Sequence, residues 1–292
     1  MEEKRESSRK VITRRHFIKG AAFSTLGLAF PFLSADPVSR LVLVRDENAV
    51  DAAHTIDDNI VAQMIDTAMQ HFSGETDIRS AWRKYIKPTD TVGVKITRCR
   101  WMRIPTEEAV VEAIVKRVRD IGIAENRIHT GDYGLPVEQC TVLINVPSVK
   151  VHSLTGLASS IKNYINFSDN PRKYHHGNNE KLGEIWNFPK IKGKTRLVIT
   201  DLLRPYFGPG PQINPAHRWD YKGILVSSDP VASETVCLSI CQQKRDLFKG
   251  ESWPITPPPL FIAAADKKYG LGTSDPHKIK LKKLGWQKDI LI

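Results

Sequence analysis

Residues 142–163, VLINVPSVKVHSLTGLASSIKN, join an apolar strand pattern to a polar, ionisable segment. The run Val142–Ile144 is typical of a buried strand, and a proline soon ends it. Lys150, His152 and Ser153 follow, ahead of a segment whose apolar residues recur at helical spacing. The stretch therefore predicts a buried strand that leads into a helix, with ionisable side chains at the joint. Ligands bind at that edge in open α/β sheets.

The residues at this joint form the candidate site. Ser153 is a candidate N-cap for the predicted helix, and Lys150 and His152 precede it, so their side chains can converge near the helix N-terminus. A helix N-terminus attracts anions. Lys162, on the predicted third turn, lies about 12 Å from the cap by helical rise. It is therefore expected to pack against the sheet and not to share one ligand with Ser153.

Strand and helix patterns alternate along the rest of the chain. Strand patterns lie at 40–44, 91–96, 127–130, 195–201 and 223–226, with a terminal edge strand at 279–281. Helical patterns lie at 55–72, 82–86, 105–118, 228–241 and 260–269. This order predicts an α/β fold: a mostly parallel sheet flanked by helices, in a single domain after an N-terminal signal peptide. We expect the boundaries to be 1–35 for the signal peptide and 36–292 for the domain.

Capping signals bound two of these helices. Thr55 is predicted to cap the first helix, and Gly74 is predicted to end it. Asp229, directly before a proline, is predicted to be the N-cap of the helix at 228–241, which we prefer to a role in chemistry.

Two other predicted strands deliver ionisable side chains to their carboxyl ends. Lys95 follows the apolar part of one strand directly, so it can point inward, and Arg98 begins a basic loop that contains two more arginines. That loop is either an anion clamp or a solvated surface. Asp201 ends the strand at 195–201 and is a general base, a ligand or a turn-forming residue.

A polar segment at 167–193 is either a lid over the sheet edge or a surface insertion. It contains the adjacent His175 and His176, which invite a metal site. Neighbouring histidines seldom ligate one ion together, and no carboxylate lies near them at a metal-binding spacing, so we predict no metal ligands. The four cysteines lack the clustered spacing of an iron–sulfur site.

The N-terminal residues resemble a twin-arginine export signal. Residues 13–19, TRRHFIK, precede an apolar run at 21–33 that is too short and too interrupted to span a bilayer as a stable helix. Cleavage is expected after Ala35, although Leu33 fits poorly three places before the cut. We therefore expect the twin-arginine translocase as a partner during export and a periplasmic location, with a membrane tether if the signal stays uncleaved. Export in the folded state permits a cofactor, whose identity the sequence leaves unknown.

The composition favours an anionic ligand. The formal net charge is +11; residues 1–35 hold seven Lys/Arg and three Glu, a net +4, which leaves +7 for the remainder. The chain has no long Lys/Arg run and no recognisable reading module, so nucleic acid is not an expected partner. It also lacks the phosphate-loop and dinucleotide fingerprints and the Gly-x-Ser-x-Gly motif, which argues against nucleotide cofactors and a serine nucleophile of that kind.

Residues 144–163 resemble the pattern Asn-x-Pro-x-x-Lys-x-His-x-x-x-Gly-x-x-x-x-x-Lys-Asn of an uncharacterised bacterial and archaeal family, catalogued as domain of unknown function number 362. VGVKI at 92–96, ILVSSDPVASETVC at 224–237 and KKYGLGTSDPHKIKL at 267–281 resemble other parts of that family. The resemblance implies a single α/β domain. It also implies that the positions to watch are Lys95, Asn145, Lys150, His152, Lys162, Asn163, Asp201 and Asp229. Some relatives carry a cysteine-rich ferredoxin-like module that this chain lacks, so no electron-transfer role is carried over.

We expect an exported enzyme that acts on a small anionic substrate, a carboxylate or a phosphate. His152 would transfer a proton, since imidazole has its ordinary pKa nearest neutrality, and Asp201 would orient it or act as the base. Lys150 would hold negative charge beside them. The expected ligand-binding residues are Lys95, Arg98, Asn145, Ser153, Lys162 and Asn163, the last as a donor to an oxyanion. The alternatives are a satisfied buried histidine at 152, a non-catalytic periplasmic binding or maturation protein, and a metal-dependent enzyme.

Overall fold

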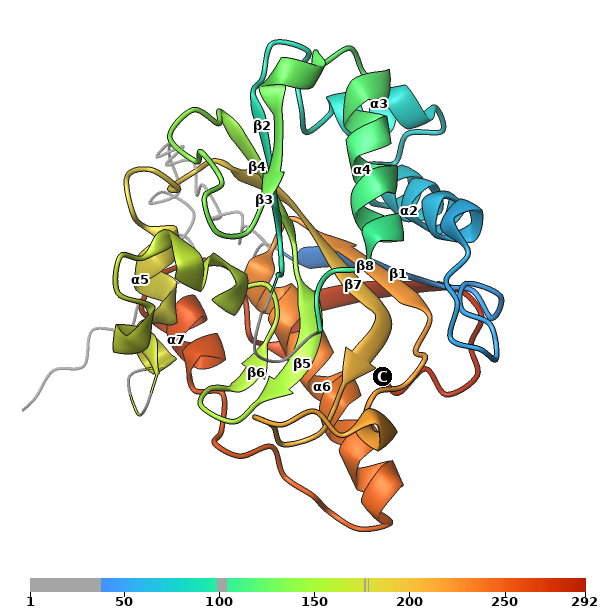
Figure 1. Cartoon of the computed structure of the whole chain (residues 1–292), viewed down its shortest axis with the longest axis vertical. Helices are drawn as coiled ribbons and strands as arrows, with labels where there is room; N and C mark the ends of the chain where they lie inside the picture. The colour runs from blue at the N-terminus through green and yellow to red at the C-terminus, as the bar shows by residue number, and fades with distance from the viewer. Residues whose placement is uncertain (1–37, 99–103, 176, 178) are drawn as a thin grey trace, which may run out of the picture. The chain divides into compact units, whose positions relative to one another are not determined.

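One mixed sheet organises the part of the chain that the structure describes, which comprises residues 38–98, 104–175, 177 and 179–292 (Figure 1). In this computed structural model the nine strands of that part follow the order β3-β2-β4-β7-β8-β1-β9, while β5 pairs with β7 and β6 with β5 off this path. The strands are β1 Ser39–Arg45, β2 Val92–Ile96, β3 Ile128–Gly131, β4 Val142–Val146, β5 Ser148–His152, β6 Gly156–Ala158, β7 Thr195–Tyr206, β8 Gly223–Ser227 and β9 Ile279–Gly285. The predicted signal peptide and the remainder of the basic loop, residues 99–103, lie outside the described residues.

Most strand pairs are parallel. The parallel pairs are β1–β9, β2–β3, β2–β4, β4–β7 and β5–β7. Strand β8 runs antiparallel to both β7 and β1, and β6 runs antiparallel to β5. The predicted fold class, a mostly parallel sheet flanked by helices in a single domain, is confirmed. Strand β7 continues to Tyr206, beyond Asp201, where the strand was predicted to end.

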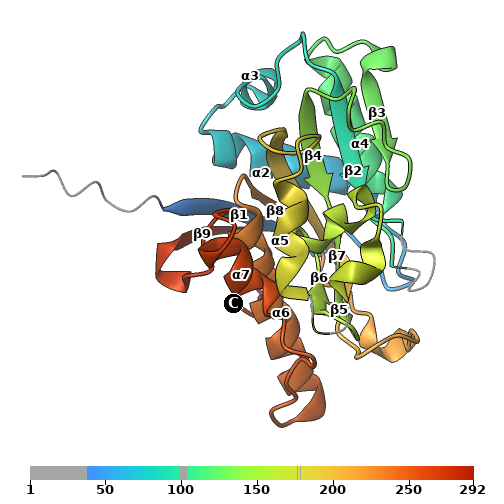
Figure 2. The ribbon, with the colours of Figure 1, turned by 90° about the vertical axis from the view of Figure 1, so that its left-hand side faces the viewer.

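Helices cover both faces of the sheet (Figure 2). Successive side chains of each strand point to opposite faces, so each strand packs against helices on both sides. In β1, Val42 and Val44 join the cluster that includes residues of α2, α3 and α4. Leu41 and Leu43 join the cluster that includes residues of α5, α6 and α7. The helices are α2 Asp58–Ser73, α3 Ile78–Arg83, α4 Glu108–Asp120, α5 Gly183–Trp186, α6 Pro230–Lys249 and α7 Phe261–Lys267. Strands that are buried on both faces read as continuous apolar runs.

The helix ends follow the capping signals with one exception. Asp229 caps α6 as predicted, and its carboxylate accepts two backbone N–H bonds of 2.8 Å from the first turn. Gly74 ends α2 in the left-handed conformation, with φ of 81°. The prediction that Thr55 caps α2 is wrong. Asp57 does so, because the helix begins at the next residue and its two free amides reach this carboxylate.

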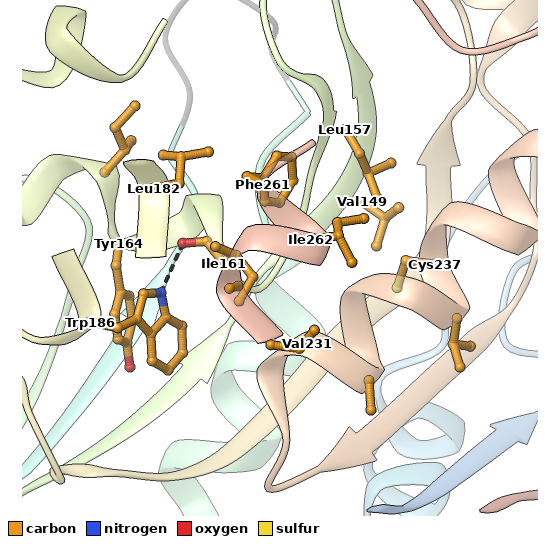
Figure 3. Packing of buried hydrophobic residues seen from close by; sticks show 14 of the residues in the cluster. Val149, Leu157, Ile161, Tyr164, Leu182, Trp186, Val231, Cys237, Phe261 and Ile262 are labelled. Carbon is orange, nitrogen blue, oxygen red and sulfur yellow. Dashed lines mark hydrogen bonds between the residues drawn. The ribbon is translucent and has the colours of Figure 1, made fainter. Parts of the chain in front are cut away.

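The helix predicted to follow Ser153 does not form. The chain instead turns back as the β5–β6 hairpin, and a 3-10 helix, η2 Lys162–Phe167, follows it. Gly156 makes this turn with φ of 80°. The apolar residues of this segment fit a helical period, but Leu157 is buried in the same cluster as Val149 of the neighbouring strand (Figure 3). Tertiary burial thus overrides the local periodicity.

Packing against Trp186 holds η2 in place (Figure 3). The indole Nε1 of Trp186 donates a 3.0 Å hydrogen bond to the carbonyl oxygen of Ile161, and its ring stacks on Tyr164 with 4.2 Å between centroids. The Tyr164 hydroxyl lies 2.8 Å from Oγ1 of Thr195 at the start of β7. The segment that carries Lys162 is therefore tied to the sheet. Within the described residues, no helix combines the length and the hydropathy that crossing a bilayer requires.

Candidate functional site

A pocket of about 410 Å³ lies beside the β5–β6 hairpin. Thr97 and Asp132 reach it from just beyond the carboxyl ends of β2 and β3, and Lys162 and Asn163 reach it from η2. Its apolar lining includes Leu154, Ala158, Ile165, Pro171 and Pro211. The volume suits a small molecule of metabolite size.

Strand β5 contributes a row of polar side chains to this pocket. Ser148, Lys150 and His152 are spaced two residues apart, so they project from the same face of the strand, and all three line the pocket. Lys150 is 4% exposed, and its ammonium lies 3.0 Å from the Ser148 hydroxyl oxygen. That hydroxyl in turn donates a 2.7 Å bond to the Ile104 carbonyl. A strand, and not a helix N-terminus, therefore presents these residues.

The two histidines of the pocket stack on each other. The rings of His152 and His175 are nearly parallel, with an interplanar angle of 5° and centroids 5.7 Å apart. Burial, together with the charges of Lys162, His175 and Lys150, lowers the pKa of His152 to about 2. His152 is thus neutral at physiological pH. With so low a pKa it is a weak base, and an anion that offsets the neighbouring charges would raise that pKa.

Lys162 lines the same pocket as Ser153, although we expected it to pack against the sheet and not to share one ligand with Ser153. Its ammonium is 3.1 Å from Nε2 of His175, and both Lys162 and Ser153 line the pocket. The helical rise had predicted a separation of about 12 Å. No helix separates the two residues, because the hairpin turns the chain back between them.

A buried polar network lies next to the pocket. The ammonium of Lys95, which is fully buried, is 2.7 Å from Oδ1 of Asp132, and the same oxygen accepts a 2.6 Å bond from Asn166. Burial alone would raise the pKa of Asp132, but Lys95, Asn166 and the Arg98 amide hold it below the ordinary value. Asp132 is the only acid among the described lining residues, and Lys95 already balances its charge.

The two asparagines of the family pattern belong to this network. Nδ2 of Asn163 donates to the Lys95 carbonyl at 3.0 Å and to Oδ1 of Asn145 at 2.7 Å. Asn145 donates in turn to the Ser160 carbonyl at 2.9 Å. Both amide hydrogens of Asn163 are therefore engaged in joining β2, β4 and η2. In this arrangement Asn163 has no hydrogen left for an oxyanion, and Asn145 is fully buried.

Asp201, a residue of β7, lies beside the N-terminus of α4 and does not line the pocket. Its carboxylate accepts backbone N–H bonds from Glu107 at 2.8 Å and from Leu203 at 2.9 Å. Burial and the nearby Glu107 carboxylate raise its pKa to about 7. The structure therefore does not bring Asp201 into contact with His152. Arg98 is exposed and reaches the network only through its backbone amide, which donates to Asp132 at 2.7 Å.

A second buried acid, Glu234 of α6, contacts Ser160 and Ile161, which directly follow the pocket residue Ser159. One of its oxygens accepts bonds from the Ser160 hydroxyl at 2.9 Å and from the Ile161 amide at 2.7 Å. The other oxygen is buried with no hydrogen-bond partner, and burial raises the pKa of Glu234 to about 7. The sequence analysis missed this residue because nothing local distinguishes an acid one turn into a capped helix from a solvated one.

Asp132 and His175 are among the pocket residues that the sequence analysis did not assign to the site. Asp132 was not singled out, although its place directly after β3 matches the place of Lys95 near the end of β2. His175 was considered only for metal binding. Among the described residues, no three His, Cys, Asp or Glu side chains group together in a way that could hold a metal ion. The pocket thus contains two lysines, Lys150 and Lys162, and two histidines, His152 and His175, beside an aspartate whose charge Lys95 balances.

Comparison with known proteins yields one match. Residues 51–239 match the model of a family described as "Domain of unknown function (DUF362)". No curated protein matches the chain, and no solved structure does. The matched range covers more than half of the chain and includes every described residue that lines the pocket.

Proposed function

The chain belongs to the DUF362 family, and on that premise we propose that the pocket inside the matched range binds and converts a small anionic molecule, a carboxylate or a phosphate. The protein would then be an enzyme whose binding groups are lysines and whose proton-transferring groups are imidazoles. The reaction class that fits these residues is proton transfer to or from an oxyanion-bearing substrate.

The observation that carries this proposal is the charge of the pocket. Lys150 and Lys162 bring two ammonium groups to a largely buried site of about 410 Å³. The one acid of the described lining, Asp132, already has its charge balanced by Lys95. Like charges repel strongly in a site of low dielectric, so an anion between the two lysines stabilises the arrangement. Lysines that only contacted water would not need to be buried, so the burial of Lys150 and Lys162 supports a role in binding a ligand.

The chemistry follows from how the substrate changes the site. The two ammonium groups bind the negative charge, and the apolar residues Leu154, Ile165 and Pro211 surround the remainder of the ligand. Burial is the main cause of the pKa of about 2 of His152, and the charges of Lys162, His175 and Lys150 lower it further. The anion offsets these charges, so the pKa of this imidazole rises when substrate is bound.

A non-catalytic binding protein would use the same pocket, and one experiment separates the two. The ligand that remains bound after native purification is identified by mass spectrometry and is then incubated with the wild type and with His152→Gln. An enzyme converts the ligand, and the variant keeps its affinity but loses turnover by about 10²-fold or more. If the wild type binds the ligand and never converts it, the catalytic part of the proposal fails and the binding part stands.

We further propose that the protein is exported by the twin-arginine route to the periplasm. The motif TRRHFIK at 13–19 and the apolar run after it support this, as they combine an arginine pair with a moderately apolar segment. Export in the folded state suits a domain whose pocket depends on a buried ion pair that forms only with the complete sheet.

A further inference from the structure

The Lys162–His175 contact indicates where the proton of the His175 imidazole lies. An ammonium holds its proton far more strongly than an imidazolium does, and it can only donate. With 3.1 Å between Nζ of Lys162 and Nε2 of His175, the lysine is the donor and Nε2 is an unprotonated acceptor. His175 is therefore neutral in this arrangement.

The stacked partner is neutral as well, by an independent contact. The backbone N–H of Leu154 donates to Nδ1 of His152 at 3.2 Å, so this nitrogen carries no proton. The proton of His152 must then be on Nε2. Hydrogen bonding alone thus assigns both imidazoles of the pocket to the neutral form.

The surrounding charges explain why neither imidazole takes a second proton. Among the described residues, the charged groups that line the pocket around this pair are Lys150, Lys162 and Asp132. Lys95 balances the charge of Asp132, and the buried Glu234 of α6 interacts electrostatically with Lys162. A further positive charge in so buried a site would be costly.

We propose that His175 takes up one proton when an anion binds in the pocket, and that it is thereby the proton-donating residue of the site. The anion accepts hydrogen bonds from Lys162 and draws the ammonium away from Nε2 of His175. Nε2 then accepts a proton from solvent and faces the bound anion as a donor. The proton that enters offsets one negative charge of the anion. This inference rests on the proposed function, because it needs an anion in the pocket.

His175 is better placed for this than His152, to which the sequence analysis gave the acid–base role. The amide of Leu154 occupies Nδ1 of His152, and two lysines and the second imidazole act on its ring. His175 lies at the end of a short 3-10 helix, Pro171–Tyr174, at the rim of the pocket, and it is only partly buried. Its Nε2 is released by the same lysine that binds the anion.

The chain supplies a matched control outside the pocket. Nζ of Lys282 lies 2.9 Å from Nδ1 of His71, on the edge strand β9 and helix α2. His71 has the same kind of lysine contact but is exposed and does not line the pocket. A proton uptake that belongs to the pocket disappears in His175→Gln and persists in His71→Gln.

The test is calorimetric titration of the full chain with sulfate, which stays fully ionised near neutral pH, and with benzoate. Each titration is run in two buffers with different ionisation enthalpies. We expect about one proton taken up per anion bound by the wild type and by His71→Gln, and an uptake near zero for His175→Gln. If either anion binds without proton uptake, or if the uptake is unchanged in His175→Gln, the inference is overturned. If neither anion binds, the proposed function itself fails, which is a distinguishable result.

Because His175→Gln can also disturb the fold, a second measurement reads the wild type directly. Imidazole nitrogen chemical shifts in NMR distinguish the neutral tautomers from the imidazolium. We expect one pocket histidine to change from neutral to imidazolium when sulfate is added at neutral pH, while the signal of His71 stays unchanged. Two pocket imidazoles that remain neutral at saturation would contradict the proposal.

Discussion

The buried ion pair between Lys95 and Asp132 is the residue contact on which the pocket floor depends. Both side chains are nearly fully buried. Asn163 accepts a further hydrogen bond from Lys95, and Asn166 and the Arg98 amide donate to the two carboxylate oxygens of Asp132. Replacing Lys95 by Met leaves a buried carboxylate without its counter-charge. We expect the free energy of unfolding to fall by about 3–5 kcal/mol in urea denaturation.

The double variant Lys95→Met/Asp132→Asn is the control for this prediction. It removes both charges, so it should be more stable than Lys95→Met alone by at least about 1 kcal/mol. A Lys95→Met protein that unfolds within about 1 kcal/mol of the wild type would show that the pair contributes little.

At the residue scale, the sequence predicted five polar pocket residues of the family stretch, but it missed Ser148, Ser159 and the partners of the predicted residues. Lys150, His152, Ser153, Lys162 and Asn163 all line the pocket. The stacking of His175 on His152, and the pairing of Lys95 with Asp132, join residues that are distant along the chain. Hydrophobic spacing carries no information about such contacts, because they depend on which loops converge after the sheet has formed.

At the scale of the element, Asp201 links β7 to the start of α4, and this link makes stability depend on pH. The unfolded side chain has a pKa near 4, and burial raises the folded pKa to about 7. Between these values the folded state keeps the proton that the unfolded state has released. The contribution of Asp201 is therefore complete below about pH 4 and is lost as the pH rises to about 7, by up to about 4 kcal/mol.

Chemical denaturation of Asp201→Asn across this pH range checks the prediction. The variant should be less stable than the wild type at low pH, because one backbone amide loses its acceptor, but its own stability should not decline with this slope. Asp77→Asn is the control, since the exposed Asp77 caps helix α3 and hydrogen bonds with Ser80 lower its pKa. It should leave the decline between about pH 4 and 7 in place. Equal slopes in the wild type and Asp201→Asn would exclude Asp201 as the source.

The β5–β6 hairpin should be sensitive to any side chain at its turn. Gly156 has φ of 80°, and a Cβ there would clash with the carbonyl oxygen of Pro257. Gly193 has φ of 74° in a turn with open space around it, so it isolates the conformational part of the effect. We expect Gly193→Ala to lower the free energy of unfolding by about 1–2 kcal/mol and Gly156→Ala to lower it by more. If both variants lost the same free energy of unfolding, the close approach of Gly156 to Pro257 would not contribute to the effect.

The β5–β6 hairpin is also the element that was predicted wrongly from the sequence. The strands at 40–44, 91–96 and 223–226 were predicted within a residue or two, because buried β-branched runs and capped helices are local signals. The segment after Ser153 was predicted as a helix, because its apolar spacing suits a helix equally well. The pairing of Val151 with Leu157 across the turn decided the outcome, and such pairing is not visible in local spacing.

At the scale of the whole molecule, the proposal of export depends on the arginine pair at positions 14 and 15. A fusion of residues 1–40 to a reporter that is active only when exported folded should reach the periplasm. Replacing both arginines by lysine should abolish this export, because the translocase reads the pair itself and not the charge alone. Export that is unaffected by the double replacement, or that needs an unfolded reporter, would contradict the proposal.

The central claim is that the pocket binds a small anion through its buried lysines, and equilibrium binding of a panel of small carboxylates and phosphates tests it most directly. The panel is titrated into the full chain, into Lys150→Met and into Lys194→Met. Lys194 is a suitable control because its ammonium also contacts a backbone carbonyl, that of Val137 at 2.9 Å, but lies outside the pocket. The account predicts that at least one anion binds the wild type and Lys194→Met equally, and binds Lys150→Met at least about tenfold more weakly. Affinities that are the same for all three proteins, or no binding by any anion of the panel, would contradict it.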